Sequence, residues 1–125
     1  KLVSETKVST ILVSHDLASI KNFTDKIIVM YAGTIVEVAK IKEFFDEPLH
    51  PYSKALIASL PRLNKVTKIT GLKGQIPDYY NPPLGCRFFD RCDYRMEICG
   101  NRKPPFFEFS KTRKVACFLY KSDFN

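Results

Sequence analysis

The residues of this sequence best suited to chemistry are four cysteines near its C-terminal end. Cys86, Cys92, Cys99 and Cys117 follow the spacing C-x5-C-x6-C-x17-C. Four thiols can form two disulfides, bind Zn²⁺ tetrahedrally or hold an iron–sulfur cluster. The first two gaps are wider than those of a zinc ribbon, and the spacing also differs from the usual ferredoxin patterns. The spacing leaves these interpretations open, together with unbonded cysteines that fill a core.

Arginines are interleaved with these cysteines. Arg87, Arg91 and Arg95 could offset the negative charge of a thiolate cluster, or they could form an ordinary solvated basic face. With aromatic neighbours they could also bind nucleic acid by stacking, using Phe88, Phe89, Tyr94, Phe106 and Phe107. These aromatic residues lie beside prolines and cysteines, where a small core has to form. Nucleic acid is therefore the less favoured partner.

His15 is the second candidate for chemistry. It follows the apolar, β-branched run "VSTILVS" (8–14), which predicts a buried parallel strand, and it precedes a predicted helix. The carboxyl ends of strands line the ligand crevice in open α/β sheets, so His15 could donate to a phosphate oxygen or orient a water. The alternative is a histidine satisfied by a neighbouring backbone group. His50, in "LHPY", is expected only to start a helix.

The charge of the chain is concentrated in its second half. The 125 residues carry 20 Lys/Arg and 13 Asp/Glu, a net charge of +7, of which residues 65–125 contribute +6 (12 against 6). This excess suits an anionic partner or cofactor. The start of the sequence lacks the apolar segment of a signal peptide, and no run approaches the roughly 20 apolar residues of a membrane helix. Because residue 1 is lysine, we expect a piece of a longer protein or a processed product.

The N-terminal half predicts an α/β fold. Asp16 can cap a helix, Gly33 can adopt the positive φ of a tight turn, and Pro51 suits the first turn of a helix. The apolar periodicity predicts strands over 8–14, 26–31 and 34–39, and helices over 16–23, 41–48 and 51–60.

The C-terminal half has a different composition. Prolines and glycines interrupt it repeatedly, which predicts short strands and loops rather than long elements. A segment with so little regular structure usually needs a covalent or metal staple to stay folded. We place the boundary near residues 62–68, giving predicted domains 1–64 and 65–125.

Several motifs resemble one family of proteins. "TILVSHDLASI" resembles the segment with the switch histidine in ABC transporter ATP-binding subunits, and "DKIIVMYAGTIVE" resembles the strand pair that follows it. "PLHPYSKALIASLPRL" is similar to the HPY helix of the oligopeptide/dipeptide branch, which also includes nickel and sugar importers. "LKGQIPDYYNPPLGCRFFDRCDYRMEIC", with the later "VAC", resembles the C-terminal domain of that branch. The resemblance implies the end of a P-loop-type nucleotide-binding domain followed by a small, irregular, cysteine-rich domain.

The resemblance also implies roles for the candidate residues. His15 falls on the switch histidine, which contacts the γ-phosphate of ATP and helps to position the attacking water. The four cysteines fall on positions that hold a [4Fe–4S] cluster in some members, with zinc as the alternative cofactor. The implied partners are a second ATP-binding subunit, transmembrane permease subunits and, indirectly, an extracellular binding protein. The implied location is the cytoplasmic face of the membrane, reached through the permease.

Parts of the family pattern are missing from this sequence. It contains no G-x-x-x-x-G-K-[ST] phosphate loop, no glycine-rich signature and no acidic Mg²⁺-binding strand. We therefore expect ATP and Mg²⁺ to bind only in an intact subunit, and no ATP hydrolysis by this chain alone. The alternative function, from another class, is a small zinc- or cluster-binding module for protein or nucleic-acid recognition.

Overall fold

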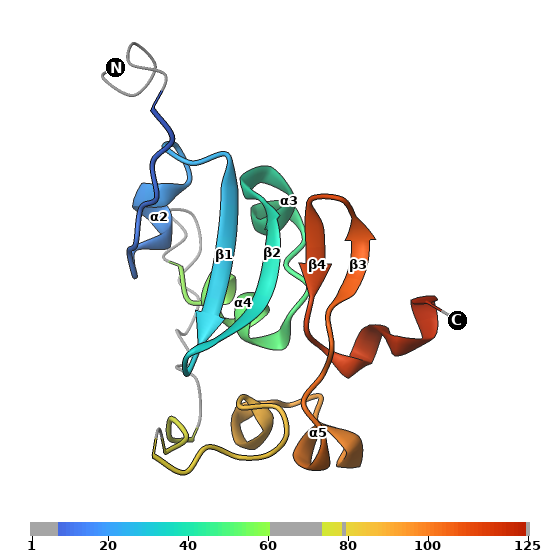
Figure 1. Cartoon of the computed structure of the whole chain (residues 1–125). Coiled ribbons are helices and arrows are strands. Elements are labelled where there is room, and N and C mark those ends of the chain that lie inside the picture. Colours follow the sequence, from blue (N-terminus) through green and yellow to red (C-terminus); the bar gives the residue numbers. More distant parts are fainter. Residues whose placement is uncertain (1–7, 61–73, 79, 125) are drawn as a thin grey trace.

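The computed structural model describes residues 8–60, 74–78 and 80–124. Its centre is a four-stranded antiparallel sheet in the order β1-β2-β4-β3 (Figure 1). The strands are β1 (Lys26–Tyr31), β2 (Thr34–Lys40), β3 (Phe107–Ser110) and β4 (Arg113–Val115). Because β4 pairs with β2, segments from the two halves of the sequence share one sheet. The fold is mixed α/β, as the sequence predicts.

The β1–β2 hairpin confirms the predicted strands and turn. Along β1, buried and exposed residues alternate, with Ile27, Val29 and Tyr31 facing the core. Ala32 and Gly33 both have positive φ, 46° and 78°, which matches the right-handed twist of a two-residue hairpin turn. Glycine adopts this conformation without steric cost.

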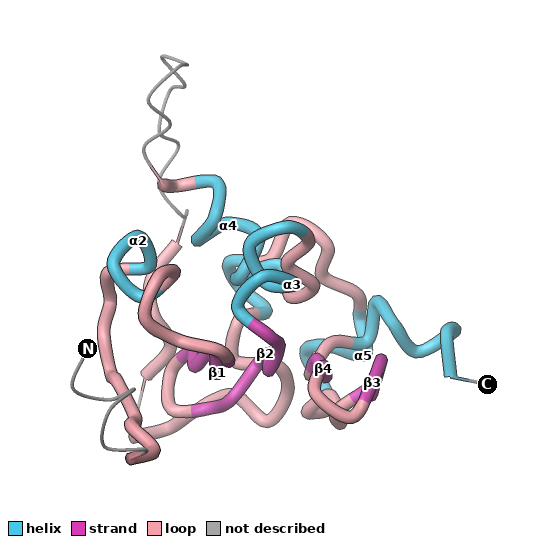
Figure 2. Tube along the Cα trace, turned by 90° about the horizontal axis from the view of Figure 1, so that it is seen from above, coloured by secondary structure: helices cyan, strands magenta, loops and turns pink. Residues whose placement is uncertain are grey.

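Three helices lie on the same side of β1 and β2 (Figure 2). They are α2 (Leu17–Ile20), α3 (Ile41–Asp46) and α4 (Pro51–Ala58). α2 is shorter than predicted, but Asp16 caps it by accepting from the N–H groups of Ala18 and Ser19. The core between helices and sheet contains Ile20, Ile27, Val29, Tyr31, Val36, Ala39, Phe44 and Phe88.

The predicted buried strand over 8–14 is wrong in this structure. These residues form an irregular segment, and Ile11 and Val13 are 93% and 92% exposed. A buried parallel strand requires neighbouring strands that take up its N–H and C=O groups. Among the described residues no strand pairs with this run, so its β-branched composition does not suffice to make it a strand.

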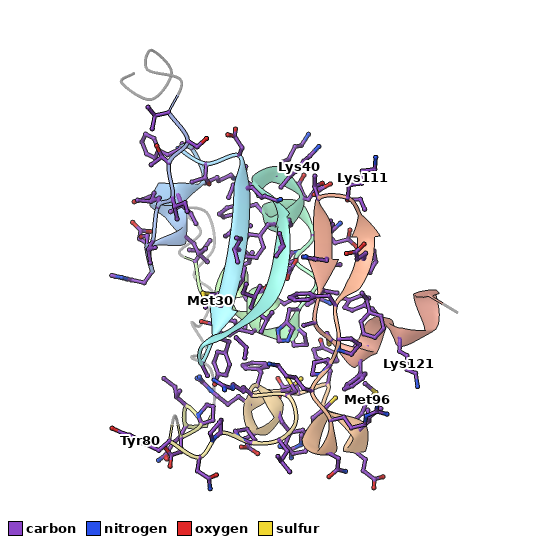
Figure 3. All side chains as sticks on the ribbon, viewed as in Figure 1. Met30, Lys40, Tyr80, Met96, Lys111 and Lys121 are labelled. Carbon is purple, nitrogen blue, oxygen red and sulfur yellow. The ribbon has the colours of Figure 1, made fainter. Side chains whose placement is uncertain are left out.

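The cysteine-bearing part consists of short elements, as predicted. It contains the 3₁₀ helices η1 (Phe89–Arg91) and η2 (Phe118–Phe124) and the helix α5 (Glu97–Asn101), with α5 below the sheet in Figure 1. Tyr80, labelled in Figure 3, lies in the loop before the first cysteine and is fully exposed. The predicted boundary at 62–68 lies outside the described residues, and the two-domain division stays a prediction. No helix in the described part of the chain is long and apolar enough to cross a membrane.

A buried carboxylate connects the sheet to α4. Glu37 on β2 has no exposed surface, and its two oxygens accept from the backbone N–H groups of Leu49 and His50, each at 2.9 Å. The Tyr120 hydroxyl of η2 donates to the Leu49 carbonyl at 2.8 Å. One acidic side chain therefore fixes the loop that leads into α4.

We predict that Glu37→Ala lowers the free energy of unfolding by about 3 kcal/mol, because two buried N–H groups lose their acceptor. Urea unfolding followed by circular dichroism measures this change. The control is Glu108→Ala on β3, whose side chain is exposed and whose loss should cost less than about 0.5 kcal/mol. Equal unfolding midpoints for wild type and Glu37→Ala would contradict the prediction.

Candidate functional site

All four cysteines line one cavity of about 20 Å³. Cys86 precedes η1, Cys92 follows it, Cys99 lies in α5 and Cys117 follows β4. Residues spread over about thirty positions of the sequence are thus brought around one point. All four are free thiols, so they form no disulfide with one another.

Backbone contacts hold three of these cysteines in place. The Cys86 N–H donates to the Cys99 carbonyl at 2.7 Å, and the Cys99 N–H donates to Met96 at 2.9 Å. The Cys92 N–H closes η1 by donating to Phe89 at 3.2 Å. Gly85 makes the first contact possible, since a Cβ at this position would lie 2.2 Å from the Cys99 carbonyl oxygen. The sequence signals this glycine only as a turn residue.

The thiols of Cys86, Cys92 and Cys117 favour their neutral form in this environment. Burial raises the pKa of Cys86 and Cys92, and it raises the pKa of Cys117 to about 12. The neighbouring cysteines raise these pKa values further, because adjacent thiolates repel one another. A cation at the centre would reverse this balance by stabilising the thiolates.

The site has a suitable donor set but not a closed coordination geometry. Four convergent sulfurs, two buried and two partly buried, suit a soft cation such as Zn²⁺ or the irons of a cluster. In the described residues, however, no group of three or more His, Cys, Asp or Glu is arranged so that it could hold a metal ion. The cavity also has room for about one water-sized atom.

The arginines of the cysteine segment contact the hairpin. Arg87 donates to the Ala32 carbonyl at the turn, and Arg91 donates to the Tyr31 hydroxyl at 3.2 Å. Arg95 lies over the Phe89 ring, 5.8 Å from its centre. Arg87 and Arg91 therefore attach this segment to the β1–β2 hairpin, and the predicted role of the arginines in offsetting thiolate charge stays a prediction.

His15 is exposed and lies just before α2, away from the cysteines. Its neighbour Asp16 caps that helix, and the Ser19 hydroxyl, which donates to the Asp16 carboxylate, lowers the pKa of Asp16. α2 lies beside β1, whereas α5 lies below the sheet (Figure 1). The structure thus keeps the two predicted sites apart, and the predicted role of His15 stays a prediction.

Sequence reasoning missed His50 as part of the cysteine site. It is the N-cap of α4, as predicted, but it also lines the cavity and is only 1% exposed. Burial lowers its pKa to about 4, so the imidazole is neutral at physiological pH. Its ring packs on Phe88, with ring centres 5.8 Å apart. The only local signal was its position at the helix start, which says nothing about the distant cysteines.

Comparison with protein-family models matches residues 36–99 to the oligopeptide/dipeptide transporter C-terminal region. This match spans half of the chain and contains His50, α4 and three of the cysteines. The chain belongs to this family, which confirms the resemblance seen in the motifs.

Curated relatives carry related names. The chain is 40% identical over 116 residues to the dipeptide transport ATP-binding protein DppD of Caldanaerobacter subterraneus subsp. tengcongensis, covering 92% of this chain and 36% of that protein. It is 43% identical over 113 residues to the oligopeptide transport ATP-binding protein OppD of Mycoplasma genitalium, covering 90% and 28%. It is 37% identical over 123 residues to the oligopeptide transport ATP-binding protein AppD of Bacillus subtilis, covering 98% and 38%. The chain thus spans about a third of the length of these relatives.

We predict that Gly85→Ala separates the Cys86 loop from α5, because the added methyl group cannot fit against the Cys99–Gly100 backbone. Cys99, which is 9% exposed, should then react with a thiol reagent at least about tenfold faster under native conditions. Leu84→Ala is the matched control, since Leu84 is 89% exposed. Equal labelling rates for Gly85→Ala and wild type would show that this contact is dispensable.

Proposed function

We propose that this chain forms the C-terminal region of the ATP-binding subunit of an oligopeptide/dipeptide-type ABC importer. Its membership of the transporter C-terminal region family supports this proposal, as do the names of its relatives. The intact subunit binds ATP and Mg²⁺, pairs with a second ATP-binding subunit and docks on transmembrane permease subunits. An extracellular binding protein delivers the imported substrate to that permease. The subunit is peripheral and lies on the cytoplasmic face of the membrane.

The four cysteines form the ligand set of a metal centre in this region. The observation that carries this proposal is their convergence on one cavity from different elements. The resemblance favours a [4Fe–4S] cluster, with zinc as the alternative. When bound, the centre supplies a cross-link between the four cysteine-bearing segments, whose own elements are at most seven residues long. Its role is therefore structural, and it stabilises the cysteine-rich region.

His15 acts as the switch histidine of the intact subunit. Its side chain is exposed and directly precedes a helix whose N-terminus is capped. An imidazole in such a position can reach a phosphate oxygen and orient the attacking water. In this proposal the phosphate loop and the Mg²⁺ ligands come from outside the present sequence.

Nucleic-acid recognition fits the structure less well. Several aromatic rings that could stack on bases already pair with cations of the same chain: Lys54 with Tyr94, Arg95 with Phe89, Arg113 with Phe109 and Lys114 with Phe106. These contacts lie 5.0–5.9 Å from the ring centres. Aromatic rings and cations that already contact one another are poorly placed to bind a nucleic-acid strand.

We predict that the chain purified without oxygen is brown and contains iron and acid-labile sulfide in equal amounts. Elemental analysis and visible absorption measure this. Replacing all four cysteines with serine should remove both the colour and the metal. A colourless protein with one zinc per chain would establish the zinc alternative, and a chain free of metal would overturn the metal-centre proposal.

In the intact subunit, we predict that His15→Ala lowers the rate of ATP hydrolysis by about 100-fold, because an orienting group for the transferred phosphoryl is lost. Asn22→Ala, an exposed change just after α2, is the control and should leave the rate unchanged. Phosphate release at saturating ATP measures both variants. Hydrolysis by His15→Ala at the wild-type rate would remove His15 from the mechanism.

A further inference from the structure

The side of β1 and β2 that is turned away from α2, α3 and α4 is apolar over part of its area, and we call it the outer face (Figure 2). Residues directly opposite one another on paired strands share a face, and here Ile28 pairs with Val38 and Met30 pairs with Ile35. Ile28 is 57% exposed, Met30 is 56% exposed and Ile35 is 40% exposed. Three large apolar side chains therefore lie next to one another in contact with solvent.

The composition of β1 is that of a strand covered on both sides. Ile27, Val29 and Tyr31 face the core, and Ile28 and Met30 alternate with them on the outer face. An antiparallel sheet with one solvated face normally alternates apolar with polar residues, whereas a strand buried on both faces reads as a nearly continuous apolar run. The sequence KIIVMY is of the second kind. A second layer is therefore expected against the outer face.

Lysines border the apolar part of the outer face at one end. Lys26 and Lys40 are direct cross-strand partners, and Lys114 lies opposite Val38 on the next strand. In Figure 3, Lys40 lies at the end of the hairpin away from Met30. Like charges directly opposite one another repel, and in the part of the chain that the structure describes neither Lys26 nor Lys40 pairs with a carboxylate. A carboxylate brought to this end of the face would relieve the repulsion.

The lengths of the relatives indicate where the covering layer comes from. The matches span 90–98% of this chain but only 28–38% of the relatives, so most of each relative lies outside the matched region. An exposed apolar patch marks an interaction site, and the rest of the same subunit is large enough to cover this one. A second copy of the chain suits it less well. In a symmetric dimer the outer face would meet itself and add positive charge to positive charge.

We propose that the outer face docks an apolar surface with an acidic rim, contributed by the part of the intact subunit that lies outside this sequence. This inference rests on the proposed function. Ile28, Met30 and Ile35 pack against the apolar part of that surface, and a carboxylate lies beside Lys26 and Lys40. The same hairpin holds the cysteine segment, so it joins that segment to the rest of the subunit.

The first test uses the two methionines of the sequence, Met30 and Met96. The intact subunit is produced with a photoreactive methionine analogue and illuminated, and mass spectrometry identifies the peptide captured at each position. We expect Met30 to capture a peptide of the same subunit from outside the present sequence. Met96, at the N-cap of α5 and 36% exposed, is the internal control and should capture mainly water.

The outcome at Met30 decides between the occupants. A cross-link within one subunit to a segment outside this sequence supports the inference. A cross-link that joins two subunits through Met30 makes a second copy the occupant and overturns it. Capture of water alone shows that the outer face is solvated in the intact subunit and also overturns it.

The second test concerns the acidic rim. Lys26→Glu should raise the thermal unfolding midpoint of the present chain, because it replaces a like-charge pair by an opposite pair with Lys40. In the intact subunit the same change should lower the midpoint, because the new carboxylate faces the acidic rim. The control is Lys121→Glu, the same charge change on the exposed surface of η2, which should shift both midpoints alike. Shifts of equal sign for Lys26→Glu would overturn the acidic rim.

Binding of ATP to the intact subunit separates the two levels of the argument. A subunit that binds ATP while its Met30 captures only water keeps the proposed function and loses this inference. A subunit that binds no ATP contradicts the proposed function, and the inference fails with it.

Discussion

The interaction on which the rest of the structure depends is the acceptance of two backbone N–H groups by the buried Glu37 carboxylate. A carboxylate without exposed surface is costly unless donors surround it, and here Leu49 and His50 supply them. Because these donors belong to consecutive residues, the bonds fix both the position and the direction of the chain as it enters α4. The ring of His50 then faces Phe88, and the wall of the cysteine cavity is complete.

A second set of contacts connects the cysteine segment to the hairpin. Phe88, 2% exposed, inserts its ring among Tyr31, Tyr52 and His50. Arg87 donates to the turn carbonyl of Ala32, and Arg91 donates to the Tyr31 hydroxyl of β1. The irregular segment thus has an aromatic anchor and two guanidinium contacts even before a metal is considered. This explains how a region with little regular structure can hold its four thiols near one another.

Local patterns in the sequence predicted the local parts of the fold. These patterns depend only on residues close together in the sequence: the apolar alternation over 26–31, the turn residue Gly33 and the helix-start residue Pro51. The hairpin and α4 form where these patterns predict them. The strand over 8–14 failed because a parallel strand depends on partners that its own residues do not encode. Three other features also depend on residues that are distant in the sequence. They are the pairing of β4 with β2, the burial of Glu37 and the position of His50 in the cavity wall. The cysteine spacing left a shared site as one of several possibilities, and it could not indicate which other side chains complete the wall of the cavity.

The pairing of β4 with β2 has a consequence for the order of assembly. Val115 lies opposite Glu37, so the contact closes a very long loop, and such contacts form late in folding. Cys117 comes two residues after Val115 and arrives with it, whereas Cys86, Cys92 and Cys99 are near neighbours in sequence. Three of the four thiols that line the cavity can therefore come together early, and the fourth joins them when the sheet is completed. Completion of the cysteine cavity and closure of the β-sheet are then a single cooperative event.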